Sequence, residues 1–163
     1  MSRPSTLPEQ TASALKLDDY LPYRLSVASN AVSSLIARAY EDRFGLSIPQ
    51  WRLICVLAED GAKTQREIVL RTVMDKVTVS RAAHGLVTRR LVARKSNKAD
   101  GRSHVLALTR EGERLHAEIA PLALAYEAAL ISGLAPAEVA QLKRLLARLQ
   151  GVAVTLSGAA QPQ

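Results

Sequence analysis

The spacing of the apolar residues departs from a helical pattern in one region of this chain, which begins near residue 91. Before that point the apolar side chains recur every three or four residues, as in helices, and after about residue 110 they do so again. Between those regions, Leu91–Arg94 and Val105–Leu108 instead have the spacing of short strands. The polar connection between them ends near an Asp100-Gly101 turn pair. The pattern predicts a mainly α-helical fold with one small β-hairpin, a wing.

Two short helices are predicted directly before the wing. The run Thr64-Gln65-Arg66-Glu67 has the form of a capping box, which starts a helix of about two turns. Residues 72–74 then separate it from a second helix that starts at Asp75 and ends near residue 90. Two helices joined by so tight a turn are typical of a helix-turn-helix. We expect its second helix to turn one set of residues inward, Val77, Ala82, Ala83, Leu86 and Val87, and another outward, Lys76, Thr78, Ser80 and Arg81.

Longer helices are predicted on both sides of this region. The first spans residues 19–44 and ends at Gly45, and a shorter helix begins near Pro49. A helix from residue 110 to 132 contains Pro121, which removes one of its hydrogen bonds. The last helix begins near Pro136 and carries a leucine stripe over residues 139–152. Residues 1–18 and 158–163 lack this periodicity and are expected to be a flexible arm and tail.

Positive charge is concentrated in one third of the chain. The whole sequence has a net charge of +7, but residues 63–110 hold 12 Lys and Arg against three Asp and Glu, which gives +9. The remainder therefore carries −2. A uniformly basic surface could simply keep a protein in solution, whereas a concentrated patch fits the phosphate backbone of a nucleic acid. This distribution favours nucleic acid over an anionic membrane as the partner.

Several classes of protein are disfavoured by what the sequence lacks. It contains no phosphate-binding glycine loop, no Gly-x-Ser-x-Gly and no His-Glu-x-x-His, so we expect neither an enzyme nor a cofactor. Three separated histidines, His84, His104 and His116, do not have the spacing of metal ligands. The single cysteine, Cys55, lies among apolar residues and is interpreted as a buried, inert thiol rather than an oxidation sensor. No apolar run suits a membrane span or a signal peptide, so a cytoplasmic protein is expected.

These features together resemble the MarR family of winged helix-turn-helix transcription regulators. The resemblance covers about residues 20–150 and is carried by the runs IPQWRLICVLAEDG, TQREIVLRTVMDKVTVSRAAHGLVTRRLV and KADGRSHVLALTREG. The family's wing signature is met by Asp100, Arg102, Leu108 and Thr109. The chain departs from the family pattern in two places. It has Arg90 where a glycine usually ends the second helix, and Ala135 where a serine usually caps the last one.

The resemblance implies an obligate homodimer in which the first and last helices of two subunits interleave. The leucine stripe over residues 139–152 agrees, because so small a chain offers it too few partners. We therefore expect one domain over residues 19–157. Within it, residues 47–110 would form the DNA-binding core, and residues 19–45 and 110–157 the dimerisation helices.

Candidate DNA contacts follow from this arrangement. On the second helix, Arg81 could pair with a guanine edge, while Thr78 and Ser80 could meet bases or phosphates. In the wing, Arg102 could enter a narrow minor groove. The alternatives are a solvated helix face capped by Asp75, and a purely structural pairing of Arg102 with Asp100. The full predicted DNA-binding set is Thr64, Gln65, Lys76, Thr78, Ser80, Arg81, Arg94, Lys98 and Arg102.

A polar stripe on the first helix suggests an effector site. Ser26, Ser29, Asn30 and Ser33 share one helical face, which could be solvent-exposed or could supply donors to a ligand. With Trp51 and Tyr23 nearby, Ser29 and Asn30 could bind a small aromatic acid. The resemblance implies that such acids or phenols release DNA, and it points more weakly to the branch that controls aromatic or heteroaromatic acid breakdown. We expect a repressor with an inverted-repeat operator; the alternative is an effector-independent regulator or a DNA-organising protein.

Overall fold

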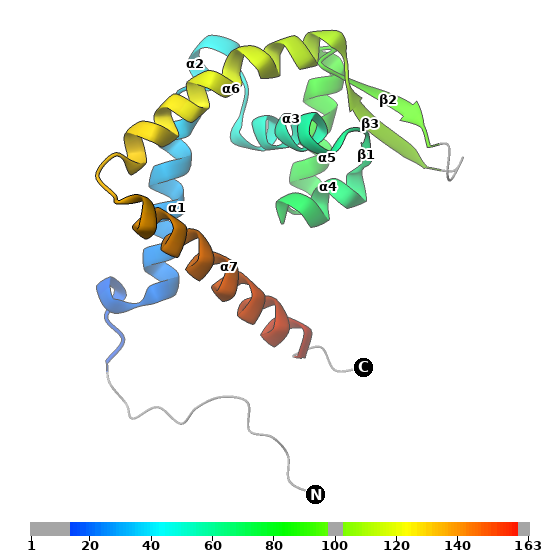
Figure 1. The fold of residues 1–163 in the computed structure, drawn as a ribbon. Helices are drawn as coiled ribbons and strands as arrows, with labels where there is room; N and C mark the ends of the chain where they lie inside the picture. The colour runs from blue at the N-terminus through cyan, green and yellow to red at the C-terminus, as the bar shows by residue number, and fades with distance from the viewer. Residues whose placement is uncertain (1–13, 98–102, 160–163) are drawn as a thin grey trace, which may run out of the picture.

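The computed structural model describes residues 14–97 and 103–159, and it is mostly helical with one small sheet (Figure 1). The described residues form one 3-10 helix, η1 (Leu17–Asp19), and seven α-helices: α1 (Leu21–Ala37), α2 (Glu41–Phe44), α3 (Ile48–Asp60), α4 (Gln65–Thr72), α5 (Lys76–Thr88), α6 (Arg110–Ile131) and α7 (Pro136–Ala159). The strands are β1 (Lys63–Thr64), β2 (Val92–Ser96) and β3 (His104–Leu108). This confirms the predicted winged helix-turn-helix class.

The short elements form one body, and the long helices extend from it. Helices α3, α4 and α5 lie together beside the sheet, whereas α1, α6 and α7 reach away from them (Figure 1). The sheet is antiparallel with the order β1-β3-β2, so it has one strand more than the predicted hairpin. Val92 pairs with Leu108 across the wing, and Lys63 pairs with Leu106 on the other side of β3. Strand β2 also lies slightly later than the predicted Leu91–Arg94.

The core of this body is apolar and closely packed. Leu53 and Ile54 of α3, Ile68 of α4, Leu86 of α5 and Ile119 of α6 are all fully buried. Because one helical face of each element supplies these residues, α3 becomes the central helix against which the helix-turn-helix and α6 are positioned.

The first predicted helix is not continuous, which corrects the prediction of one helix over residues 19–44. Helix α1 ends at Ala37, and the amides of Ala39 and Tyr40 donate to carbonyls three residues earlier, at 2.9 and 3.0 Å. This turn precedes the separate short helix α2. It allows both Ala39 and Tyr40 to be buried, and that burial outweighs the continuous helix that the apolar spacing favoured.

At both positions where the chain departs from the family pattern, nearby hydrogen bonds stabilise the helix end. Arg90 adopts the left-handed conformation itself, with φ 59°. The amide of Leu91 then donates to the Leu86 carbonyl at 3.0 Å, and the Thr109 hydroxyl donates to the Arg90 carbonyl at 2.8 Å. At the start of α7, the Ala135 amide donates to Glu138 at 2.7 Å, which is half of a capping box without the missing hydroxyl.

The chain ends differ from the predicted boundaries. Helix α7 continues to Ala159, so the first two residues of the predicted tail at 158–163 are helical, and the others lie outside the described residues. The predicted arm at 1–18 lies mostly outside the described residues, and its last residues lead into η1. In the part of the chain that the structure describes, no single helix is long and apolar enough to cross a membrane. Only α6 and α7 taken as a pair reach that length and composition, and they are bent by 105°.

Candidate nucleic-acid interface

The helix-turn-helix begins with the predicted capping box. The Thr64 hydroxyl accepts from the Glu67 amide at 3.2 Å, and the Glu67 carboxylate accepts from the Thr64 amide at 2.7 Å. The same carboxylate accepts from the Thr64 hydroxyl at 2.8 Å. These hydrogen bonds from Thr64 hold the pKa of Glu67 below its ordinary value. Helix α4 ends at Thr72, and Val73 caps it in the left-handed conformation with φ 56°.

Asp75 caps the second helix of the pair, α5. Its carboxylate accepts from the Thr78 hydroxyl at 2.6 Å and from the Thr78 amide at 2.8 Å. These two hydrogen bonds lower the pKa of Asp75, so the cap is ionised at neutral pH. The Thr78 hydroxyl is therefore committed to its own helix end, which makes it a poorer candidate for a base contact than the sequence suggested.

The buried face of α5 differs from the prediction at one position. Val79, Ala82, Ala83 and Leu86 face the core, whereas Val77, which was expected to face inward, is 57% exposed. The prediction for Val77 is wrong because the buried positions follow i, i+3, i+4 and i+7 from Val79, and a residue two positions earlier lies on the opposite side.

The outward residues near the start of α5 include three of the nine predicted DNA contacts. Lys76, Ser80 and Arg81 are exposed there. Arg81 and Thr78 also line a shallow cavity of about 300 Å³ together with Ser47 and Gln50 at the start of α3. The first turns of α3 and α5 thus open onto the same surface.

A second cavity joins the start of α4 to the wing. It has a volume of about 330 Å³ and is lined by Thr64 and Gln65, by Arg94 of β2 and by residues of β3. Since neighbouring residues of a strand point to opposite faces, Lys95 lies on the other side of the sheet, in a cavity of about 550 Å³ beside α6. The cavity at the start of α4 thus brings together three predicted DNA contacts, Thr64, Gln65 and Arg94. Two others, Lys98 and Arg102, lie outside the described residues.

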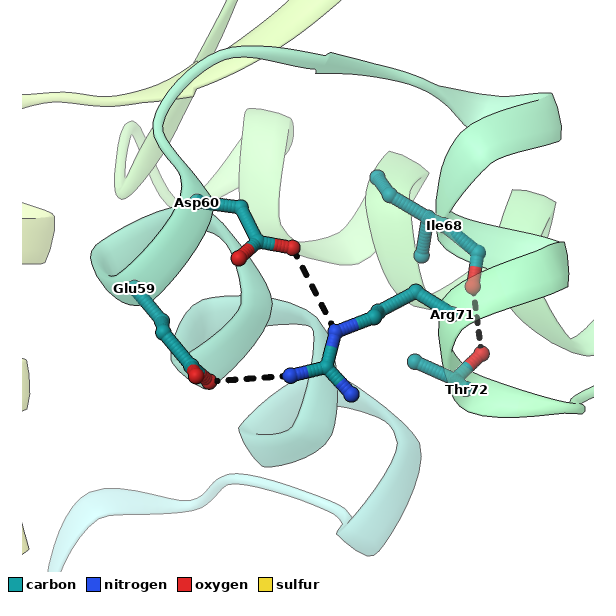
Figure 2. Close-up of polar contacts among 5 residues, drawn as sticks. All are labelled: Glu59, Asp60, Ile68, Arg71 and Thr72. Carbon is teal, nitrogen blue, oxygen red and sulfur yellow. Dashed lines mark hydrogen bonds and ion pairs between the residues drawn. The ribbon is translucent and has the colours of Figure 1, made fainter.

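Arg71 carries out a structural role that the charge count did not reveal. Its guanidinium lies between two carboxylates at the end of α3, with Nη2 3.3 Å from Glu59 and Nε 3.4 Å from Asp60 (Figure 2). In the same turn, the Thr72 hydroxyl donates to the Ile68 carbonyl at 2.7 Å. Arg71 therefore ties α4 to α3, and its charge is largely compensated within the protein.

Arg89 is also held within the protein, at the end of α5. Its two terminal nitrogens donate to the Phe44 carbonyl at 2.7 Å and to the Gly45 carbonyl at 3.0 Å. These are the free carbonyls at the end of α2, so Arg89 caps that helix from a distance in sequence of more than 40 residues. No short motif signals such a contact.

The predicted effector residues do not surround one cavity of the single chain. Leu25 and Ser29 line a groove of about 800 Å³ between α1, α6 and α7, but Tyr23, Asn30 and Trp51 are not among its lining residues. Trp51 is only 8% exposed. Its ring stacks on Tyr40 and on His116, with ring centroids 5.4 and 5.5 Å apart. Most of the Trp51 surface is thus used by the core.

The thiol of Cys55 is partly buried on α3, and this burial raises its pKa to about 11. A protonated thiol is a weak nucleophile at neutral pH, in keeping with the interpretation of Cys55 as inert. Among the residues that the structure describes, no three His, Cys, Asp or Glu side chains gather in a way that could hold a metal ion.

Known proteins share both the motif and the whole arrangement. The model of the MarR family matches residues 44–103. A MarR family transcriptional regulator from Silicibacter pomeroyi is 30% identical, with 82% of this chain and 89% of that one covered and a TM-score of 0.73. BpsR from Bordetella bronchiseptica, whose DNA binding is regulated by 6-hydroxynicotinic acid, is 25% identical (85% and 98% covered, TM-score 0.77). A MarR/EmrR family regulator from Acinetobacter sp. ADP1 is 24% identical (86% and 99% covered, TM-score 0.80) and shares the fold. No curated protein sequence matches.

Proposed function

This chain belongs to the MarR family of DNA-binding transcription regulators, and from that premise we propose that it is a dimeric repressor released from its operator by a small aromatic carboxylate or phenol. Members of this family regulate transcription and are not enzymes. We propose that it acts in the cytoplasm.

One observation carries the DNA-binding part of the proposal: the exposed start of α5 lies within the segment that bears +9. In helix-turn-helix proteins the first residues of the second helix meet base edges in the major groove. We assign base contact to Arg81, and base or phosphate contact to Lys76 and Ser80. Gln65 and Arg94, which line one cavity at the wing together with Thr64, are assigned to the phosphate backbone. The Thr64 hydroxyl is bound to Glu67, so a contact of Thr64 with phosphate would have to compete with that cap. Lys98 and Arg102 are assigned to the wing's own contact with DNA.

The dimeric part is supported by the apolar faces of the long helices. Leu142 and Leu146 of α7 line the groove between α1, α6 and α7 and are more than 40% exposed in one chain. A second copy would cover this surface, and a two-fold dimer places its two recognition helices about 34–36 Å apart, or one turn of DNA. We therefore propose an inverted-repeat operator.

The effector part rests on BpsR and on the polar stripe of α1. BpsR, a 25% identical relative, is regulated by a heteroaromatic acid. Ser29 lies at the edge of the apolar groove and offers a hydroxyl donor beside Leu25, and Asn30 follows it on α1. A site that also uses Tyr23 or Trp51 would need the partner subunit to complete it. A ligand bound there would favour one separation of the two recognition helices over the other.

Selection of bound duplexes from randomised DNA tests the DNA-binding part. Arg81→Ala should lose about 1–3 kcal/mol on the selected operator and much less on random DNA, because a base contact is lost. Arg94→Ala should weaken binding to both and make the salt dependence shallower by about one unit, because a phosphate contact is lost. Equal affinity of the wild type for operator and random DNA would instead indicate a DNA-organising protein.

Titration of the operator complex with a panel of aromatic acids tests the effector part. The wild type should release DNA, and the double variant Ser29→Ala with Asn30→Ala should bind the operator normally but respond only at higher ligand concentration. Unchanged release by the double variant would remove these two residues from the site. Failure of every acid would favour an effector-independent regulator.

A further inference from the structure

We propose that Val77 recognises the methyl group of a thymine in the major groove and thereby helps to set the operator sequence. The proposal rests on the proposed function, since it requires that the start of α5 enter the major groove. It concerns a residue that the apolar pattern assigned to the core and that the structure places on the surface.

Val77 occupies the second position of α5, directly after Lys76. Its side chain is 57% exposed, whereas Val79 is fully buried, so the core does not use it. In helix-turn-helix proteins this first turn of the second helix approaches the base edges. An apolar side chain therefore stands where DNA contacts are made.

The neighbours of Val77 define what can cover it. Lys76 precedes it and Arg81 follows four residues later, which places Arg81 beside Val77 on the same helical face. Both are cations, which fit a polyanion and disfavour an apolar protein partner. Among the groups that base pairs expose in the major groove, the thymine methyl is the apolar one. The surface around Val77 is cationic with an apolar centre. DNA matches both features, because its phosphates are anionic and the thymine methyl is apolar.

Thr78 is less available than Val77 for such a contact. Its side chain is only partly exposed, and its hydroxyl donates to Asp75 at 2.6 Å, which holds the side chain at the helix start. Four residues of helix span about 6 Å, which corresponds to about two base-pair steps. We therefore expect the thymine read by Val77 to lie within about two base pairs of the base read by Arg81.

Replacement of single thymines by deoxyuridine tests this directly, because it removes the methyl group and leaves the Watson–Crick pair intact. The operator selected from randomised DNA is resynthesised with deoxyuridine at each thymine in turn. We expect deoxyuridine at one thymine position of each half-site to lower the affinity of the wild type about fourfold per half-site. This factor corresponds to the burial of one methyl group. Val77→Ala should bind the unmodified operator less tightly by a similar factor and be insensitive to deoxyuridine at that thymine.

A matched control comes from the same motif. Val73 is even more exposed, at 77%, but lies in the turn before α5. Val73→Ala should retain the full deoxyuridine effect. Thermal melting should show that Val77→Ala is folded, since the residue is exposed and alanine is the better helix former.

The possible outcomes separate the inference from the proposed function. A wild type that is insensitive to deoxyuridine everywhere, or a Val77→Ala variant that keeps the full effect, would overturn the role of Val77 while leaving an operator-binding regulator. Unchanged operator affinity of Val77→Ala would do the same, and would assign the exposed valine to contacts other than DNA. A chain that selects no preferred duplex would overturn the proposed function together with the inference.

Discussion

At the scale of single residues, each helix of the DNA-binding pair has one carboxylate that stabilises its start. Glu67 and Asp75 both accept hydrogen bonds from the backbone amide and hydroxyl of a threonine, and both have lowered pKa values. A carboxyl whose pKa is lower in the folded than in the unfolded chain stabilises the fold above its unfolded pKa. That contribution disappears as the pH falls through the folded pKa.

Glu67→Gln should remove the pH dependence of one cap without removing the cap. Glutamine can still accept from the Thr64 amide, but it does not titrate. The wild type should therefore be more stable than the variant at about pH 6, and the difference should shrink towards zero at about pH 3. Thermal melting of both proteins across this range measures it. A difference in stability that stays constant with pH would show that ionisation of Glu67 does not contribute to the stability of the fold.

At the scale of elements, the short helix α2 connects the recognition helix with a long helix. Arg89 at the end of α5 donates to the last carbonyls of α2, and Arg43 of α2 pairs with Glu118 of α6 at 2.8 Å. Since α6 belongs to the predicted dimerisation helices, this chain of contacts links α5 to that part of the molecule.

Arg89→Lys should loosen this connection while retaining the charge. A lysine cannot donate to both carbonyls in the fixed fork of an arginine. We expect operator affinity to fall and the preference for one half-site spacing to weaken, because the recognition helix is positioned less sharply. Binding to operators whose spacing differs by one base pair measures this. If Arg89→Ala loses affinity equally on random DNA while Arg89→Lys is unaffected, Arg89 acts through its charge alone.

Local elements were predicted well, and contacts between distant segments were not. The caps of α4 and α5 depend on residues three positions apart, so sequence alone predicts them. The break before Tyr40 depends on burial against Trp51, and the two residues of β1 are recognisable only through their pairing with β3. The position of Val77 was predictable in principle from Val79, which extends the apolar period of α5 by one turn.

The candidate site also has parts that local sequence predicts and parts that it does not. The recognition helix and the wing could be located because clustered charge and helix-capping residues are recognisable within short segments. The structural duties of Arg71 and Arg89 could not, since their acceptors come from α3 and α2. The effector residues were the least predictable, because Ser29 and Trp51 belong to different helices whose separation is set by packing.

At the scale of the whole molecule, one chain leaves a large apolar surface open. The groove between α1, α6 and α7 has a volume of about 800 Å³ and is lined mainly by apolar side chains such as Val139, Leu142 and Leu146. Exposed apolar surface of this extent normally marks an interface. A dimer formed there would also set the distance between the two recognition helices, so assembly and DNA binding should fail together.

Leu146→Glu tests that coupling. A carboxylate introduced into the groove would have to be buried twice in a symmetric dimer, at a cost of several kcal/mol per charge. We expect the variant to sediment as a monomer at about 10 μM and to lose at least about 100-fold in operator affinity, because each half-site is then bound separately. Arg144→Glu is the matched control, because it changes the charge of α7 by more than Leu146→Glu does. Arg144 lies two residues before Leu146, so its side chain points away from the groove, and it is not among the lining residues. It should remain a dimer. A Leu146→Glu protein that stays dimeric and binds the operator tightly would place the interface elsewhere on the molecule.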